Sequence, residues 1–182
     1  MQIDLATFTN SFYNPGSFLK RLIWHYTNHI FFKNGFFPIY GFKVFILRSF
    51  GAKIGNGVII KPNVNIKYPW KLSLGNNVWI GENVWIDNLD DIIIGNNVCI
   101  SQGATLMCGN HNYKKSTFDL IIKPIILEDG VWIGATSFVS GGVTAKSHAV
   151  LTVGSIATID LEPYSINKGN PAVKIKDRVI VS

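Results

Sequence analysis

Aliphatic residues recur every six positions through most of the chain, each followed by a small or polar residue and, four positions later, by a second small or β-branched residue. The run starts with Ile54-Gly55-Asn56-Gly57-Val58-Ile59 and Ile60-Lys61-Pro62-Asn63-Val64-Asn65, and it ends at Ile156. A period of six fits neither the 3.6-residue turn of an α-helix nor plain strand alternation, because each unit is a short strand plus a turn. We therefore expect an all-β solenoid of parallel strands.

The same pattern predicts which side chains form the core. In each unit the first aliphatic residue and the residue four positions later should point inward, and Gly or Asn should occupy the bend, where a positive φ is favoured. Three units close one triangular coil, and each coil buries its aliphatic corners on the next, so stability accumulates by stacking. A β-sandwich would not keep this phase over so many units.

Residues 1–50 lie outside the repeat and contain two predicted helices. Ser17 is a suitable N-cap for the first, which should stop at Asn34-Gly35, and the second should run from about Ile39 to Phe50. One face of the first helix carries Phe18, Leu22, Tyr26 and Ile30, reinforced by Leu19 and Ile23. We expect both helices to cover the strand edges at one end of the solenoid. The chain then divides into a helical cap (1–50), a β-helix domain (51–176) with a loop at 109–124, and a tail (177–182).

Basic residues are concentrated in the first part of the chain. Up to residue 81 there are nine Lys and Arg against one acid, Asp4, whereas the remainder has eight basic and ten acidic residues. Such asymmetry occurs in surfaces that face anionic lipid, phosphate or nucleic acid, and equally in a solvated surface that is simply basic. We predict no nucleic-acid partner, and peripheral membrane contact through residues 17–50 stays an open alternative.

The ends of the chain and its apolar stretches bear on localisation. The N-terminal MQIDLATFTN has an acid and no basic residue ahead of an apolar core, unlike a secretory signal. The stretches around 30–50 are broken by Lys33, Pro38 and Lys43, short of the ~20 apolar residues that span a bilayer. We expect a cytoplasmic protein, at the inner face of the membrane if the cap contacts lipid.

The repeat is interrupted between Leu106 and Leu127. An excursion from a solenoid lies on the surface, where a site can be built without disturbing the stack. His111 stands at the root of this loop, so a rigid coil would position it. Without further information, a single histidine in such a place is more often a solvent-exposed loop residue than a catalytic one.

Several segments beyond the repeat make the chain similar to a known family. They are Phe12-Tyr13-Asn14-Pro15-Gly16, Phe50-Gly51-Ala52-Lys53-Ile54-Gly55, Ile60-Lys61-Pro62, Lys67-Tyr68-Pro69-Trp70, Val84-Trp85-Ile86-Asp87-Asn88-Leu89, Cys99-Ile100-Ser101-Gln102-Gly103-Ala104 and Gly169-Asn170-Pro171-Ala172. The chain resembles the hexapeptide-repeat acyltransferases, in particular the colanic acid biosynthesis acetyltransferase group. The resemblance implies a left-handed parallel β-helix, a homotrimer with sites between neighbouring solenoids, and transfer of an acetyl group from acetyl-CoA to a sugar hydroxyl in exopolysaccharide or cell-surface polysaccharide biosynthesis.

The resemblance also implies a role for His111, because Gly109-Asn110-His111 matches the Gly-x-His element whose histidine is the family's general base. A sugar hydroxyl is a poor nucleophile at neutral pH, and an imidazole with an ordinary pKa near ~6.5 can take its proton during attack on a thioester carbonyl. Asn112 departs from the family, in which many members have Asp after the histidine, and so removes a carboxylate that could orient the ring.

Other site residues follow from position and from the resemblance. Asp87 and Asn88 lie about one coil before the loop, where they could bind the acceptor sugar or serve as structural turn residues; Asn110 and Tyr113 in the loop are further acceptor candidates. For the coenzyme we expect small residues that let an extended chain approach the backbone, and basic residues for its phosphates. These are Gly134, Ala135, Gly141, Gly142, Val153, Gly154, Thr158, Lys174 and Lys176, with Lys168 behind them; Ile159 and the order Val173-Lys174 depart from the family here.

Three alternatives remain at the level of the sequence. A covalent acyl intermediate on Cys108 would need a second histidine nearby to activate the thiol. A γ-class carbonic anhydrase shares the solenoid but needs several histidines around a metal, and outside the helical segment only His111 and His148 remain. A non-catalytic scaffold of stacked coils is the third. We predict no metal, since neither Cys99 nor Cys108 has metal-ligand spacing.

Overall fold

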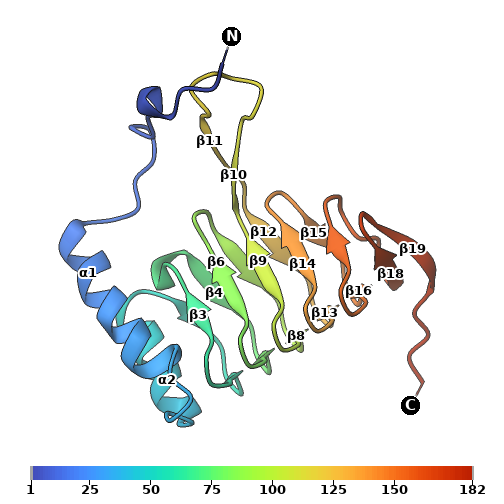
Figure 1. Cartoon of the computed structure of the whole chain (residues 1–182). Helices are drawn as coiled ribbons and strands as arrows, with labels where there is room; N and C mark the ends of the chain where they lie inside the picture. Colours follow the sequence, from blue (N-terminus) through green and yellow to red (C-terminus); the bar gives the residue numbers. More distant parts are fainter. Residues whose placement is uncertain (1, 182) are drawn as a thin grey trace.

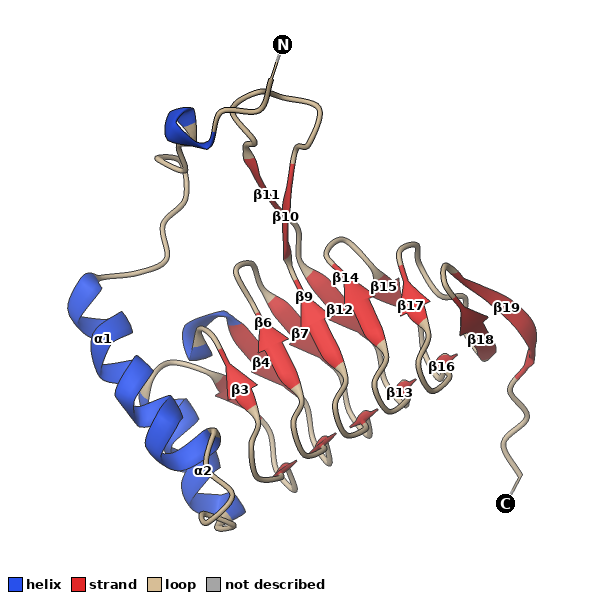
Figure 2. Ribbon diagram, viewed as in Figure 1, coloured by secondary structure: helices blue, strands red, loops and turns tan. Residues whose placement is uncertain are grey.

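The computed structural model describes residues 2–181 and shows a parallel β-solenoid of about six turns, with helices at one end and a hairpin projecting from one edge (Figure 1). The strands of the solenoid form three sheets, which are the faces of a triangular prism (Figure 2). Sheet A contains β1 (Lys53–Ile54), β4 (Leu72–Leu74), β7 (Ile92–Ile94), β12 (Ile125–Leu127) and β15 (Thr144–Ala145). Sheet C contains β3 (Asn65–Ile66), β6 (Trp85–Asp87), β9 (Thr105–Met107), β14 (Phe138–Ser140) and β17 (Ile156–Ala157). The predicted solenoid is confirmed.

Sheet B is longer, because the chain ends on it. Its strands are β2 (Ile59–Ile60), β5 (Trp79–Ile80), β8 (Cys99–Ile100), β13 (Trp132–Ile133), β16 (Val150–Leu151), β18 (Ser165–Gly169) and β19 (Ala172–Asp177). The pairing within the solenoid is parallel, whereas β19 folds back antiparallel on β18. The last strand, β19, therefore closes the C-terminal end of the solenoid.

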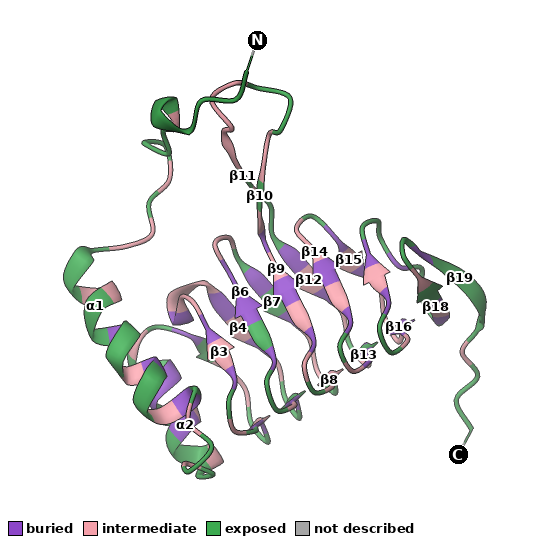
Figure 3. Ribbon diagram, viewed as in Figure 1, coloured by how far each residue is buried: buried purple, intermediate pink, exposed green. Residues whose placement is uncertain are grey.

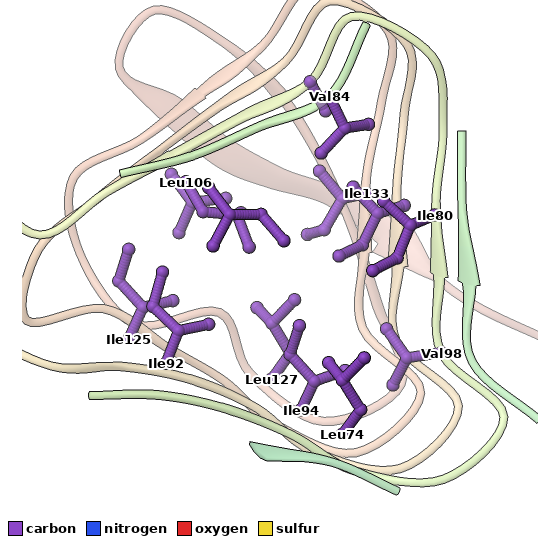
Figure 4. Close-up of a cluster of buried hydrophobic side chains, with 14 of the residues drawn as sticks. Leu74, Ile80, Val84, Ile92, Ile94, Val98, Leu106, Ile125, Leu127 and Ile133 are labelled. Carbon is purple, nitrogen blue, oxygen red and sulfur yellow. The ribbon is translucent and has the colours of Figure 1, made fainter. Parts of the chain in front are cut away.

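Stacking in register explains the six-residue period. Ile60 pairs with Ile80, which pairs with Ile100, so that the same position of successive coils forms a column. All three side chains are buried, and burying each contributes about 1.5–3 kcal/mol. Figure 4 shows Ile80, Val84 and Ile92 pointing from different sides of the triangle toward a common centre. The inward positions read from the repeat are thus the core.

The bends of the coils carry the expected Gly and Asn residues. At the edge between sheets A and B, φ is +68° at Gly57, +55° at Asn77, +56° at Asn97 and +70° at Gly130. Asn side chains also join the coils there, since Asn77 Nδ2 donates to Asn97 Oδ1 at 3.2 Å. A left-handed backbone conformation costs little free energy for Gly and Asn, which is why these two residue types recur at the bends.

The helical cap consists of α1 (Phe18–Thr27), which continues as the π-helical turn η2 (Asn28–Phe32), and of α2 (Tyr40–Ser49). Short 3-10 turns lie at η1 (Leu5–Thr7) and η3 (Pro69–Lys71). The Ser17 hydroxyl caps α1 by accepting from Lys20 N at 3.3 Å, as predicted. Both helices pack on the first coil (Figure 1).

The packing of α1 differs from what its apolar pattern suggests. An amphipathic helix normally buries its apolar face, yet Phe18, Leu22, Tyr26 and Ile30 are exposed. The side chains that reach the solenoid are those of Trp24, Asn28 and Phe32. The cap therefore attaches through an aromatic and polar side and leaves the apolar stripe outside.

The reason lies in the unpaired backbone of the first coil. Groups of the first coil that point toward the second are paired, as Lys61 N is with Ile80 O, whereas the first-coil carbonyls that point the other way need other donors. The cap supplies one to each face: Arg48 Nη2 to Ile54 O (2.7 Å), Lys43 Nζ to Ile60 O (3.4 Å) and Trp24 Nε1 to Ile66 O (2.9 Å). The expected covering of the strand edge is achieved by these polar contacts.

At the other end, the strand β19 and Arg178 tie the C-terminal segment to the solenoid. Arg178 Nη1 donates to Gly130 O at 2.9 Å and to His148 O at 3.1 Å. The packed structure thus extends past residue 176, where the sequence had suggested a tail. Across residues 2–181, no helix combines the length and the apolarity needed to cross a bilayer.

Candidate active site

The projecting hairpin consists of β10 (Gly109–His111) and β11 (Leu120–Ile122), paired antiparallel with His111 opposite Leu120. It leaves the solenoid at the edge between sheets C and A, where β9 ends and β12 begins (Figure 2). The predicted excursion is therefore an ordered hairpin rather than an irregular loop. His111 lies on its first strand, two residues above the coil.

The His111 ring is held in one orientation and one tautomer. Its Nδ1 lies 2.9 Å from the carbonyl oxygen of Phe118. Because a carbonyl oxygen only accepts, Nδ1 must carry the proton, and Nε2 of the neutral ring is then free to accept one. The imidazole also stacks on the Phe118 ring, with centroids 4.4 Å apart and planes at 9°. These contacts suit a base, and Asn112 plays no part in them, since its Oδ1 accepts from Lys114 N.

The N-terminal segment covers this histidine, a feature that the sequence did not reveal. Asp4 N donates to Ser116 O at 2.9 Å, and the ring of Phe8 lies 5.7 Å from that of His111. Leu5, Phe8, His111 and Phe118 line a small apolar cavity of about 290 Å³. An apolar wall beside the ring limits the access of water to it. The sequence shows Leu5 and Phe8 as an apolar pair, but no neighbouring residue indicates that this pair packs beside His111.

Within the loop, a second set of contacts keeps the turn rigid. Asp119 accepts from Lys115 Nζ at 2.7 Å and from the Thr117 hydroxyl at 2.5 Å. These hydrogen bonds, that from Lys115 first, lower the pKa of Asp119. Of the acceptor candidates, Asn110 uses its Oδ1 to accept from His111 N at 2.7 Å, and Tyr113 is exposed.

Asp87 and Asn88 sit at the end of β6, one coil below the hairpin, because Asp87 pairs with Met107. The Asp87 carboxylate is nearly buried, lies 2.9 Å from Lys67 Nζ, and approaches the foot of the hairpin at Gly109. Asn88 is fully buried, and both its amide atoms bind the backbone of Tyr68 (Tyr68 N to Oδ1, 2.9 Å; Nδ2 to Tyr68 O, 2.6 Å). The structure thus gives Asn88 a structural role, and only Asp87 faces a hollow.

That hollow is a polar groove of about 370 Å³ between α1 and sheet C. Its lining residues are Arg21, Trp24, His25, Asn28, His29, Lys33, Asn65, Ile66, Lys67, Tyr68, Trp85 and Asp87. Arg21 Nε and Asn28 Oδ1 are buried without a hydrogen-bond partner, and the buried Asp87 Oδ1 has only its ion pair with Lys67. Donors, acceptors and the ring of Trp85 together suit a hydroxyl-rich ligand.

A separate cleft runs over the last coils of sheet B. Its first part, about 520 Å³, is lined by Trp132, Gly134, Ala135, Val153 and neighbouring backbone at the edge between sheets B and C. Its second part, about 470 Å³, is lined by Trp132, Lys168, Ile175, Lys176 and Arg178, among others. Lys174 is not among these residues and pairs instead with Asp177 at 2.6 Å. Arg178, which the sequence had placed in the tail, contributes the additional cation.

The remaining small residues lie elsewhere. Gly141 and Gly142 turn at the edge between sheets C and A, next to the foot of the hairpin, since Gly142 N donates to Pro124 O at 2.8 Å. Thr158 follows β17 toward the same edge and is exposed. Stacking explains two of the glycines, because a Cβ would come within 2.6 Å of Val153 N at Gly134 and of Cys108 O at Gly141. Within one chain, the predicted coenzyme residues therefore fall on two edges and do not form one groove.

Comparisons with known proteins agree with this geometry. A hexapeptide-repeat acetyltransferase of Vibrio cholerae superposes with a TM-score of 0.73 at 23% identity, over 79% of this chain and 83% of that one. A galactoside acetyltransferase in complex with coenzyme A gives 0.76 at 24% identity, over 87% and 80%. These neighbours are left-handed β-helices, and a helix of the opposite hand would not superpose, so the solenoid is left-handed.

No family model matches the chain. The WcaF protein of Escherichia coli, whose name assigns it to colanic acid biosynthesis as an acetyltransferase, is 35% identical over 167 residues, 92% of each chain. The chain belongs to the colanic acid biosynthesis acetyltransferase group of the hexapeptide-repeat acyltransferases. The resemblance noted in the sequence is confirmed.

Cys108 is a poor candidate for the nucleophile of this acetyltransferase. Its side chain is buried, and its thiol lies 3.6 Å from Asp90 O. Burial raises the pKa of the Cys108 thiol to about 12, so the reactive thiolate is scarce near neutral pH. The structure thus favours general base catalysis over an acyl-cysteine.

Within residues 2–181, no group of three or more His, Cys, Asp or Glu side chains is arranged to bind a metal ion. His111 and His148 are far apart in the sequence and lie at different edges of the solenoid. His148 stacks on Tyr164, with centroids 4.7 Å apart, at the edge between sheets A and B, whereas His111 lies on the hairpin. The described residues therefore do not converge as a carbonic anhydrase site requires.

Proposed function

We propose that this acetyltransferase moves an acetyl group from acetyl-CoA to a hydroxyl of a saccharide, in exopolysaccharide or cell-surface polysaccharide biosynthesis. The observation that carries the proposal is the hydrogen bond from His111 Nδ1 to Phe118 O, which leaves Nε2 free as a base. The names of the relatives support it, since they include galactoside O-acetyltransferase and the colanic acid protein.

His111 acts on the acceptor. Its Nε2 removes the hydroxyl proton as the oxygen forms its bond to the acetyl carbon, and the imidazolium then returns that proton to the departing sulfur. The Phe118 carbonyl stabilises the imidazolium, because it faces the N–H that carries the positive charge. The stacked ring of Phe118 restricts rotation, so the lone pair keeps its direction during turnover.

The cleft on sheet B fits acetyl-CoA. Trp132, Val153 and the small residues Gly134 and Ala135 offer an apolar wall for the pantetheine chain, and Lys168, Lys176 and Arg178 offer cations for phosphate. When bound, acetyl-CoA would supply the activated acetyl thioester. A coenzyme A complex of a structural neighbour supports this donor.

The groove between α1 and sheet C is the proposed acceptor site. Asp87 and Asn28 Oδ1 would accept from sugar hydroxyls, Arg21 and Lys67 would donate, and Trp85 would pack against a sugar face. The groove leads to the foot of the hairpin, where Asp87 lies beside Gly109. His111 is two strand residues further, about 7 Å along β10.

We also propose that the working unit is a homotrimer. His111 rises from the edge between sheets C and A, whereas the cleft opens on sheet B and its edge with sheet C, so one chain separates the base from the donor site. A neighbouring solenoid would bring the two together, and the exposed Trp79 on sheet B supplies apolar area for such a contact. The closed ring of three follows the family.

A thiol-release assay tests the function. Purified protein is incubated with acetyl-CoA and a panel of nucleotide sugars, free sugars and polysaccharide repeat units, and free thiol is measured with and without acceptor. We expect acceptor-dependent release and an O-acetylated saccharide by mass spectrometry. Acetylation of amines alone, or tight acetyl-CoA binding with no product from any saccharide, would contradict the proposal.

A further inference from the structure

The outward side of α1 and η2 forms an apolar surface, here called the cap surface. It consists of Phe18, Leu19, Leu22, Ile23, Tyr26 and Ile30, whose side chains are between 39% and 70% exposed. Figure 3 shows α1 as mostly exposed along the end of the molecule opposite the C-terminus. A run of large apolar side chains on one helical face, left outside a folded domain, marks an interaction surface.

This exposure is built into the fold. Trp24 and Asn28 fasten the helix through hydrogen bonds to Ile66 O (2.9 Å) and Asn65 Oδ1 (2.8 Å). Both contacts lie on the side away from Ile23 and Ile30, so the helix cannot turn its apolar stripe inward without losing them. The apolar side chains of the cap surface therefore stay exposed and do not pack on the solenoid.

The charges around the cap surface indicate the kind of partner that it binds. Between Leu5 and Gly81 the sequence contains no Asp or Glu. The same stretch contains nine Lys and Arg residues; of those on the helical segment, Arg21 lines the groove beside α1, whereas the Lys33 side chain is exposed. An apolar strip in a basic region without any acid is complementary to a layer of anionic headgroups over hydrocarbon.

We propose that the cap surface docks on an anionic phospholipid bilayer. The apolar side chains would enter the boundary between headgroups and acyl chains, and the flanking cations would pair with lipid phosphates. A second copy of the chain fits less well, because an isologous contact would bring the same cations face to face. The inference is independent of the proposed acetyl transfer.

Vesicle co-sedimentation of the full-length protein tests the proposal. The probes are vesicles of phosphatidylcholine alone and of phosphatidylcholine with phosphatidylglycerol. The variant is Ile23→Asp on the cap surface, and the matched control is Ile180→Asp, which alters an aliphatic residue of similar exposure near the C-terminus (56% against 50%). We expect binding to the anionic vesicles, loss of binding by about tenfold or more in Ile23→Asp, and wild-type binding in the control.

The opposite results are equally clear. A wild-type protein that stays in the supernatant with anionic vesicles overturns the proposal, as does equal binding of Ile23→Asp. Light scattering without lipid distinguishes the other occupant: if Ile23→Asp is smaller than the wild type, the cap surface is an interface between chains. Circular dichroism of both variants shows that they are folded, and thiol release shows that the acetyl-transfer site is intact.

Discussion

At the scale of single residues, His111 and Phe118 work as one unit. The carbonyl of Phe118 fixes the tautomer, and its ring fixes the plane of the imidazole. In this chain the backbone oxygen of Phe118 orients the ring, which is the role that a carboxylate after the histidine could have had.

His111→Ala should lower turnover by about 10²–10⁴, the usual contribution of a general base. Affinity for coenzyme A and the thermal midpoint should change little, because the ring is only half-buried and lies outside the core. The rise of wild-type activity with pH that a general base produces should disappear. Isothermal titration and pH-rate profiles measure these; near-native turnover with a flat profile would remove His111 from the mechanism. Phe36→Ala, which removes an exposed ring that lines neither the groove nor the cleft, is the control.

Phe118→Ala should reduce kcat by roughly tenfold and leave the KM for acetyl-CoA unchanged. The backbone oxygen remains, but the ring that stacks on His111 at 4.4 Å is lost, so the imidazole samples unproductive rotations. Phe118→Tyr keeps the ring and should restore kcat. If both variants behave alike, stacking does not position the base.

At the scale of elements, the cap serves the backbone of the first coil. Lys43 is fully buried, and its ammonium donates to Ile60 O and to Lys61 O at 3.0 Å. Burial lowers the pKa of Lys43 below its ordinary 10.5. Without this ammonium these carbonyls would be unpaired, and an unpaired carbonyl costs about as much free energy as burying the charge.

Lys43→Met should lower the free energy of unfolding by about 1–3 kcal/mol, because it leaves the carbonyls of Ile60 and Lys61 without a donor. Urea unfolding measures this, with the exposed Lys53→Met as control. The difference also has a pH dependence. The unfolded chain binds the Lys43 proton more tightly, so wild-type stability gains relative to the variant as pH rises from the lowered pKa to 10.5. A constant difference across this range would show that Lys43 is not desolvated.

At the scale of the whole molecule, His111 and the cleft on sheet B, the proposed base and donor site, lie on different sides of one solenoid. Val153 lines both parts of the cleft and is 69% exposed, so a larger side chain can block the cleft without entering the core. If one chain supplies His111 and another supplies the cleft, two inactive variants should form active sites when they assemble together.

Val153→Trp and His111→Ala should each be nearly inactive alone and recover activity when unfolded and refolded together. Mixed trimers contain sites that join an intact His111 from one chain to an intact cleft from another. Thiol release measures the recovery, and light scattering should show three copies per particle. No recovery in mixed trimers would mean that each chain completes its own site.

Much of this protein was accessible from the sequence, because its signals are local. The six-residue period follows from a strand and a bend that repeat, and Gly57, Asn77 and Ser17 each report a backbone conformation decided by their nearest neighbours. The interruption after Leu106 located the hairpin, and the Gly-x-His resemblance located His111. Tertiary structure alone decided the rest. It determines which side of α1 contacts the solenoid, that Asn88 hydrogen-bonds to the backbone of Tyr68, and that Phe118 and the distant Phe8 pack around the His111 ring. These depend on pairings between residues far apart in the chain, where unpaired carbonyls of the first coil outweighed the apolar pattern of the helix, and no short stretch of sequence carries both partners.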